Sequence, residues 1–376
     1  MLEAAYRTAF VDWLACAVAG RNSVTAVHAR ILGGDALARV AALGTAGHSL
    51  DFDDTYAPGL AHCTAPTAPV ALALGAERSA SMTVVLGAYA RGYEAMAAVA
   101  RASHPELYER GWHPTAVCGA IGAAVAASSI CGLDPDEGGN AVRLAMLQAS
   151  GLRASFGSEG KALQVGLAAA AGARGAVLAL DGVGVTDAVR SGFEAAYGAT
   201  VADPDPSKPA IVENWIKAYP CCLQTHSAIE AAARVRRDGV TPESAEVRVH
   251  PISLQAAPHR VPSDSLGAKF SIPYTTAFAM LHGPPGVESF RRLDPDALRL
   301  TARVEVVPDE GFGQSAAELR VDGHEPIRVE AALGSPQRPM DDSALRAKVR
   351  SLTGQDLADL FDDSTPARDV LAIVTA

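Results

Sequence analysis

The sequence has few aromatic residues and few lysines. Phenylalanine, tyrosine and tryptophan make up 5% of the 376 residues, and the apolar share of 49% is dominated by alanine, which favours closely packed helices. The formal net charge is −10, which argues against nucleic acid or an anionic membrane as a partner. With 20% charged residues, a chain of this length predicts a globular protein, and two domains are expected.

Several common motifs are missing. The six cysteines form no Cys-x-x-Cys pair, which favours reduced thiols. The N-terminus lacks the basic segment and apolar run of a signal peptide, so we expect a cytoplasmic protein. The glycine-containing segment before Lys161 lacks the first glycine and the Ser or Thr of a phosphate-binding loop. The uncharged run 115–133 is rich in small residues, which predicts a buried helix and no membrane span.

One segment, residues 44–62, is unusually rich in ionisable side chains for its apolar surroundings. On helical spacing His48, Asp51 and Thr55 share a face, which predicts that Asp51 points inward while Asp53 and Asp54 point outward. Buried carboxylates have to be paired, hydrogen-bonded or used in proton transfer. A solvated acidic helix end is the structural alternative. No second histidine or cysteine cluster completes a metal site, so no metal is expected.

Lysine is used sparingly, with five lysines among 32 basic residues. Lysine offers a compact charge and a pKa that burial can lower, neither of which arginine supplies. Lys161, Lys217 and Lys269 lie in distinctive surroundings, although any one of them could be a solvated surface residue. His113 precedes a proline and an apolar run, which predicts a helix start where an anion could bind. Together with Asp51 and His62, these residues predict an anion-binding pocket.

The periodicity of apolar residues changes along the chain. The first part reads as alanine-rich helices, and residues 203–209 form a joint rich in proline. Beyond this joint, alternation predicts strands starting near 246, 302, 317 and 327, with helices at 222–237 and 274–282. From 341 the helical pattern returns. The pattern predicts a mainly α fold in which an all-helical domain is followed by an α+β domain.

Six motifs resemble those of the MmgE/PrpD family, and they occur in the family's order over nearly the whole chain. They are Gly44-Thr-Ala-Gly-His-Ser-Leu-Asp-Phe-Asp-Asp-Thr, Gly111-Trp-His-Pro-Thr-Ala-Val-Cys-Gly, Gly160-Lys-Ala-Leu-Gln-Val-Gly, Ile216-Lys-Ala-Tyr-Pro-Cys-Cys, Lys269-Phe-Ser-Ile-Pro-Tyr and Gly334-Ser-Pro-Gln-Arg-Pro-Met. The family includes 2-methylcitrate dehydratase, cis-aconitate decarboxylase and some epimerases. In this chain the histidine after the aspartate motif is followed by Cys63 where the family usually has proline, and Gln164 stands where many members have histidine.

The resemblance implies a large helical domain formed by both chain ends, residues 1–205 and 336–376, and a smaller α+β lid at 206–335. It also implies a homodimer that needs no metal or organic cofactor. By motif position, the catalytic residues would be Asp51, His62, His113, Lys161, Lys217 and Tyr274, and the substrate would also contact Thr55, Gln164 and Lys269. The site would be complete only when the lid closes over the helical domain.

The expected activity is that of a cofactor-independent lyase, a dehydratase or a decarboxylase, acting on a small carboxylate or polycarboxylate. Removing a proton next to a carboxylate builds charge that lysine and histidine can stabilise. His113 or Asp51 would be the base, Lys161 and Lys217 would bind the carboxylate, and Tyr274 would donate a proton. An epimerase or double-bond isomerase using the same pocket is an alternative, as is a non-catalytic ligand-binding dimer.

Overall fold

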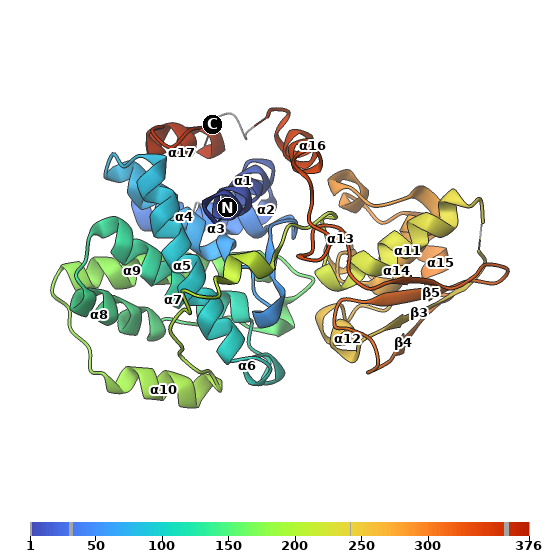
Figure 1. Ribbon diagram of the computed structural model, residues 1–376, viewed down its shortest axis with the longest axis horizontal. Coiled ribbons are helices and arrows are strands. Elements are labelled where there is room, and N and C mark those ends of the chain that lie inside the picture. The colour runs from blue at the N-terminus through green and yellow to red at the C-terminus, as the bar shows by residue number, and fades with distance from the viewer. Residues whose placement is uncertain (1, 30–32, 241, 357–360, 376) are drawn as a thin grey trace. The chain divides into compact units, whose positions relative to one another are not determined.

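The computed structural model describes residues 2–29, 33–240, 242–356 and 361–375 (Figure 1). Residues 1, 30–32, 357–360 and 376 of the predicted helical domain, and residue 241 of the predicted lid, lie outside these ranges. The described residues group into two compact units. The first contains the described residues of 1–155, 159–216 and 341–376, and the second contains those of 156–158 and 217–340.

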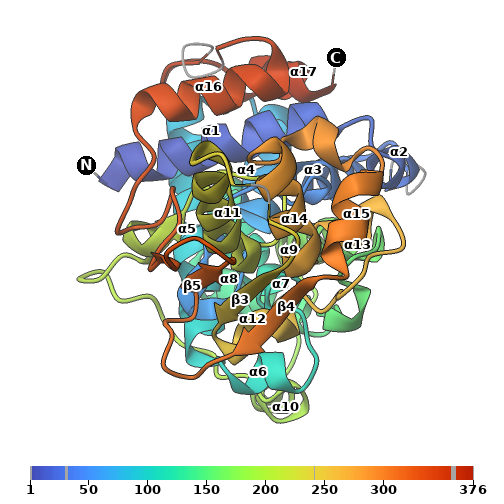
Figure 2. The same cartoon turned by 90° about the vertical axis from the view of Figure 1, so that its right-hand side faces the viewer.

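The first unit is helical. Its helices are α1 (Leu2–Gly20), α2 (Val24–Ala29), α3 (Ala36–His48), α4 (Thr64–Glu77), α5 (Met82–Ala102), α6 (Glu106–Glu109), α7 (Pro114–Cys131), α8 (Pro135–Met146), α9 (Gly160–Leu180), α10 (Ala188–Tyr197), α16 (Asp342–Thr353) and α17 (Ala367–Thr375). Short 3₁₀ turns lie at Ala57–Gly59, Arg153–Ser155 and Ala210–Glu213. Strand β1 (Thr55–Tyr56) pairs antiparallel with β2 (Asn214–Trp215). The C-terminal helices α16 and α17 pack beside α1, as Figure 2 shows.

Glycine allows the helices next to the candidate site to approach closely. Gly44 of α3 faces Gly166 of α9, and a Cβ on Gly166 would collide with the carbonyl oxygen of Ala41 and the hydroxyl of Thr45. Because only a residue without a side chain fits there, α3 and α9 lie unusually near each other. This contact brings His48, the last residue of α3, next to Lys161 in the first turn of α9.

The long apolar helices are part of the core. Helices α7 and α9 meet the length and hydropathy of a membrane span, yet 83% and 61% of their most apolar windows are buried within the protein. The prediction of a buried helix at 115–133 is therefore confirmed by α7. Within the described residues the six cysteines form no disulfide, and five of them are buried.

The second unit combines a small sheet with helices. The helices are α11 (His226–Arg237), α12 (Pro251–Ala256), α13 (Ser265–Ala268), α14 (Ile272–His282) and α15 (Pro295–Thr301), with 3₁₀ turns at Leu223–Thr225 and Val287–Phe290. The strands β3 (Ala245–Val249), β4 (Val304–Pro308), β5 (Ala317–Arg320) and β6 (Ile327–Val329) confirm the four strands expected from alternation. The order is β4-β3-β5-β6, in which β3 and β4 are parallel and the other pairs antiparallel.

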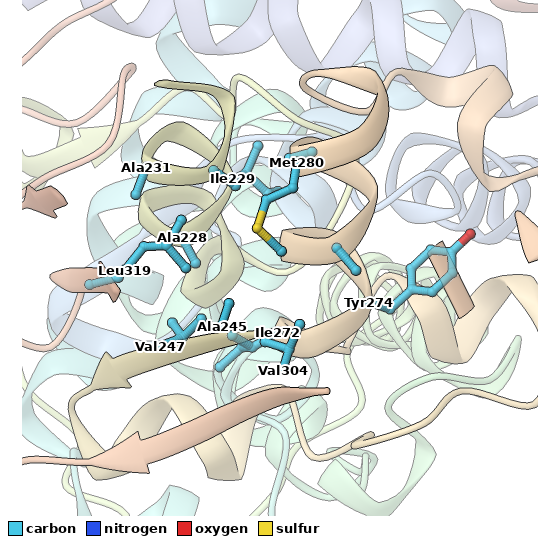
Figure 3. Packing of buried hydrophobic residues seen from close by; sticks show 14 of the residues in the cluster. Ala228, Ile229, Ala231, Ala245, Val247, Ile272, Tyr274, Met280, Val304 and Leu319 are labelled. Carbon is cyan, nitrogen blue, oxygen red and sulfur yellow. The ribbon is translucent and has the colours of Figure 1, made fainter. Parts of the chain in front are cut away.

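A shared hydrophobic core holds the second unit together. Helices α11 and α14 pack against each other, and α11 also contacts β5 and β6 while α14 contacts β4. Ala228, Ile229, Val247, Ile272 and Met280 are among the buried residues between helices and sheet (Figure 3). The chain thus has the mainly α class with a smaller α+β part that the sequence predicts.

The observed boundaries of the two units differ from the predicted domain boundaries. Residues 206–216 belong to the first unit, and residues 336–340 belong to the second. Hydrogen bonds to Glu94 and strand pairing with β1 hold residues 206–216 in the first unit. The carboxylate of Glu94 accepts hydrogen bonds from the backbone N–H groups of Ala210 (2.8 Å) and Ile211 (3.1 Å), and Trp215 pairs with Thr55.

Candidate active site

The acidic segment of the first unit does not continue the helix, contrary to the prediction from its spacing. Helix α3 ends at His48, and Asp51 takes a left-handed backbone conformation with φ of 53°. This reversal turns the following residues back into the unit, where Asp51, Asp53 and Asp54 are 4%, 0% and 0% exposed. The prediction that Asp53 and Asp54 point outward is therefore wrong. Aspartate tolerates the left-handed region better than most side chains.

A chain of charged and polar groups runs through this buried segment. The Nδ1 atom of His48 lies 2.8 Å from the Oδ2 atom of Asp53, and its Nε2 atom lies 2.8 Å from the ammonium nitrogen of Lys161. Lys161 in turn lies 2.5 Å from the Oδ1 atom of Asp51. Since a carboxylate accepts and an ammonium donates, His48 donates from Nδ1 and accepts at Nε2. His48 thus links Asp53 to the Lys161–Asp51 ion pair.

His62 lies against His48, with ring centroids 4.5 Å apart. Its Nδ1 atom is 2.8 Å from the backbone carbonyl oxygen of Asp54 and 3.4 Å from Oδ2 of Asp53. The hydroxyl of Thr55 is 3.3 Å from the same nitrogen. A carbonyl oxygen can only accept, so Nδ1 carries the hydrogen. In the neutral ring, Nε2 is therefore the basic nitrogen.

His113 begins α7, as the sequence predicts, and it is 1% exposed. Its ring centroid is 6.3 Å from that of His48. The Nε2 atom of Gln164 lies 2.6 Å from Nδ1 of His113, so Gln164 contacts a residue of the site in this structure. The Gln164 side chain also forms hydrogen bonds with the backbone of Leu152.

The electrostatic surroundings assign protonation states to these groups. Burial raises the pKa of Asp53, but His48 and His62 outweigh burial and hold that pKa well below its usual range. Burial and the charge of Asp53 raise the pKa of Asp54 well above its usual range. Burial and the charge of Lys161 lower the pKa of His113 well below 6.5, and burial also lowers that of His48. Asp53 is therefore ionised and Asp54 protonated, beside neutral rings of His48 and His113.

A metal centre does not fit this pattern of hydrogen bonds. Among the described residues, His48, Asp53 and His62 bring possible ligand atoms within 4.8 Å of one another. The Nδ1 atom of each histidine, however, carries a hydrogen directed at an oxygen. A metal ligand has to offer a lone pair, and the lone pair on the other ring nitrogen of His48, Nε2, accepts a hydrogen bond from Lys161. The arrangement is that of a carboxylate that accepts hydrogen bonds from imidazole groups.

The structure thus brings six of the nine predicted site residues together in the first unit: Asp51, Thr55, His62, His113, Lys161 and Gln164. Sequence reasoning did not include His48 or Asp53 among the site residues. Because the helical spacing placed Asp53 on the outer face, the assumed helix hid its contact with His48. A histidine and an aspartate five residues apart across a helix end were the available signal.

The other three predicted residues, Lys217, Lys269 and Tyr274, belong to the second unit. Lys217 is 1% exposed, and the ammonium nitrogen of Lys269 lies 5.6 Å from the centre of the Phe290 ring. Tyr274 of α14 is one of the buried residues of the second unit's core (Figure 3). Its hydroxyl accepts a hydrogen bond of 2.9 Å from the backbone N–H of Asp294. Burial raises the pKa of Tyr274, so the hydroxyl keeps its proton.

Comparison with known proteins places the chain in a family. Residues 35–207 match the MmgE/PrpD N-terminal domain, and residues 219–360 match the MmgE/PrpD C-terminal domain. The chain belongs to the MmgE/PrpD family. This membership confirms the resemblance seen in the sequence motifs.

Curated relatives of this MmgE/PrpD protein are cis-aconitate decarboxylases, which are lyases. The cis-aconitate decarboxylase of Aspergillus terreus is 26% identical over 81% of this chain, and that of Homo sapiens is 29% identical over 70%. The enzyme of Mus musculus is 27% identical over 82% of this chain. The chain spans 72%, 60% and 70% of these three relatives. Family and relatives together support a role of the lyase type.

Proposed function

We propose that this protein is a cofactor-independent lyase that removes carbon dioxide from a small carboxylate of the cis-aconitate type. The observation that carries the proposal is the buried chain Asp53–His48–Lys161–Asp51, with His62 and His113 beside it. A lysine cation held among neutral imidazoles provides a site for an organic anion. The names of the relatives support decarboxylation over dehydration as the reaction to test first.

Decarboxylation makes two demands on such a site. The bond between a substrate carbon and the departing carboxylate breaks, and its electron pair stays on the substrate. That carbon skeleton then takes up one proton, so that a carboxylate and a proton give carbon dioxide and a C–H bond. The enzyme needs a fixed positive charge near the remaining carboxylates, where negative charge is spread, and a proton donor near the carbon.

Lys161 meets the first demand. Lys161 is 6% exposed, and its ammonium nitrogen lies 2.5 Å from Oδ1 of Asp51 and 2.8 Å from Nε2 of His48. These contacts fix the position of the charge before a substrate arrives, so little reorganisation is required during the reaction. Asp51 has the role of orienting the cation, because it contacts Lys161 directly.

His62 meets the second demand. Its Nδ1–H group is held by the carbonyl oxygen of Asp54, so proton uptake and release take place at Nε2. The ionised carboxylate of Asp53, 3.4 Å from Nδ1, stabilises the ring when it carries both protons. In this mechanism the His62 imidazolium delivers its Nε2 proton to the substrate carbon and regains a proton from water.

The second-unit residues keep the roles that the family resemblance implies. Lys217 and Lys269 would bind substrate carboxylates, and Tyr274 would be the alternative to His62 as the donor of the single proton. Lys217→Met and Tyr274→Phe variants test these roles, because each removes the polar group and keeps most of the side-chain volume. If both variants retain full activity, these residues do not belong to the active site.

The proposed function is tested by incubating the full chain with cis-aconitate in deuterated water. We expect release of carbon dioxide and one deuterium bound to carbon in the product, and we expect a Lys161→Met variant to lose both. Deuterium in a recovered, otherwise unchanged skeleton would show an isomerase instead. Absence of carbon dioxide from cis-aconitate and from other small polycarboxylates would refute the proposal.

A further inference from the structure

The side chain of Gln164 is held in one orientation by the backbone of Leu152. The backbone N–H of Leu152 donates a hydrogen bond of 2.9 Å to Oε1 of Gln164, and the Nε2 atom of Gln164 lies 3.3 Å from the carbonyl oxygen of Leu152. Turning the amide over would place two donors against each other and two acceptors against each other. The amide oxygen of Gln164 therefore faces the N–H group of Leu152, and its amide nitrogen lies on the side of the Leu152 carbonyl oxygen.

This orientation directs an N–H group of Gln164 at His113. The Nε2 atom of Gln164 lies 2.6 Å from Nδ1 of His113, and an amide nitrogen can only donate. Nδ1 of His113 must therefore offer its lone pair. A neutral imidazole has one hydrogen, so that hydrogen is on Nε2. Burial, the charge of Lys161 and the neighbouring histidines keep the His113 ring neutral.

His62 has the opposite tautomer for an equally local reason. Its Nδ1 atom faces the carbonyl oxygen of Asp54 at 2.8 Å, so it carries hydrogen on Nδ1 and a lone pair on Nε2. In their neutral forms, the two histidines thus differ in what their Nε2 atoms do: that of His62 can accept a proton, and that of His113 donates a hydrogen bond.

We propose that Gln164 is a positioning residue that fixes His113 as the Nε2–H tautomer, so that His113 acts as a hydrogen-bond donor to a substrate carboxylate and not as the general base. The catalytic part of this statement rests on the proposed function, whereas the tautomer does not. The assignment removes His113 from the two residues that sequence reasoning offered as the base. It also restricts the group bound at His113 to an acceptor such as a carboxylate oxygen.

The tautomer is measured directly by nitrogen-15 NMR of the full chain labelled at histidine. The His113 signals are identified by their loss in a His113→Asn variant. We expect Nδ1 of His113 to resonate as a nitrogen with a lone pair and Nε2 as a nitrogen with an attached hydrogen at pH 7. A hydrogen found on Nδ1 of His113 in the unmodified protein would overturn the proposal, whatever the variants do.

The Gln164→Glu variant reverses the hydrogen bond with almost no change of volume. A carboxylate accepts, so Nδ1 of His113 must become a donor and its hydrogen moves there, or the ring takes up a second proton. Gln164→His is the matched control, because its ring N–H can donate as the amide does. We expect altered nitrogen signals for His113 in the glutamate variant and unaltered ones in the histidine variant. Unaltered signals in the glutamate variant would contradict the role of Gln164.

Kinetics then separate positioning from general structural support. Loss of one preorganised donor lowers the rate by about 10²–10³-fold, and we expect a fall of that order in kcat/KM for Gln164→Glu. The pH profile of kcat/KM for the Gln164→Glu variant should also show a titration of His113, which the profile of the unmodified protein lacks. If cis-aconitate is not a substrate but the nitrogen signals are as expected, the proposed function fails and the tautomer assignment stands. If decarboxylation proceeds with Nδ1 of His113 protonated, the assignment fails and the proposed function stands.

Discussion

The ammonium nitrogen of Lys348 lies 2.8 Å from the backbone carbonyl oxygen of Phe52. Lys348 belongs to α16, near the C-terminus, and Phe52 lies between Asp51 and Asp53 in the buried acidic segment. The same ammonium group lies 2.6 Å from Oδ1 of Asp12 in α1, and both side chains of this ion pair are buried. The C-terminal part of the first unit therefore supports the backbone of the candidate site.

Replacing Lys348 by methionine should destabilise the protein and lower activity for separate reasons. The buried Asp12 loses its counter-charge, and breaking a buried pair from one side costs about 3–5 kcal/mol. Urea denaturation measures this loss. The Asp12→Asn/Lys348→Met double variant should recover much of the free energy of unfolding but not the activity, because the Phe52 carbonyl still lacks its donor. Recovery of full activity in the double variant would show that Lys348 serves stability alone.

Lys161→Met should abolish most activity and, because it leaves the buried Asp51 without its counter-charge, should also lower the free energy of unfolding, so activity is compared per folded protein. The substitution removes the cation next to His48 and Asp51, and we expect kcat/KM to fall by at least about 10²–10³-fold. Lys161→Arg should also be poorly active, because the planar guanidinium group does not reproduce a compact ammonium in a buried position. Lys208→Met is the control, since Lys208 is exposed. Equal activity in the variants at 161 and 208 would contradict the proposed role of Lys161.

Gly166→Ala should damage the site from a distance. The added Cβ collides with the backbone of Ala41 and with Thr45, and overpacking of this kind costs about 1–3 kcal/mol. Relief of the collision moves α9 away from α3, and hence Lys161 from His48. Gly192→Ala in α10 is the matched control, because nothing lies within 4 Å of the added Cβ. There, alanine should leave activity unchanged and raise the free energy of unfolding by about 0.5–1 kcal/mol. Thermal denaturation and activity assays of Gly166→Ala and Gly192→Ala test this prediction.

The stability that His48 and His113 contribute should fall as the pH drops below about 6.5, whereas the raised pKa of Asp54 gives the opposite pH dependence. The pKa values of His48 and His113 are lowered in the folded state, so the unfolded chain takes up protons at a higher pH than the folded chain. Above the unfolded pKa neither state is protonated and these groups contribute no pH dependence. Between the unfolded and the folded pKa, each step of one pH unit removes up to about 1.4 kcal/mol per group. Urea denaturation between pH 8 and 5 measures this dependence, and His113→Asn should reduce the slope. Parallel curves for the variant and the unmodified protein would contradict the lowered pKa of His113.

The strand and helix pattern could be predicted from local sequence because each element meets a local requirement. Alternation predicted β3, β4, β5 and β6, since one face of each strand packs against helices. Proline at the first position of α7 and the Asp134 capping box of α8 mark helix starts that need no tertiary information. Strands β1 and β2 have two residues each, which is too short for alternation to reveal.

The sequence by itself pointed to Asp51, His62, His113 and Lys161, because the family's motifs are contiguous and specify residue types at fixed spacing, but it did not identify His48 or Asp53 as site residues. Only the tertiary structure decided how those residues are used. The backbone reversal at Asp51 buries all three aspartates and places Asp53 against His48. Contact with Leu152 orients Gln164, and that orientation sets the tautomer of His113. The direction of a side chain after a helix ends, and the partner that its polar atoms meet, depend on segments distant in the chain, and no local pattern contains that information.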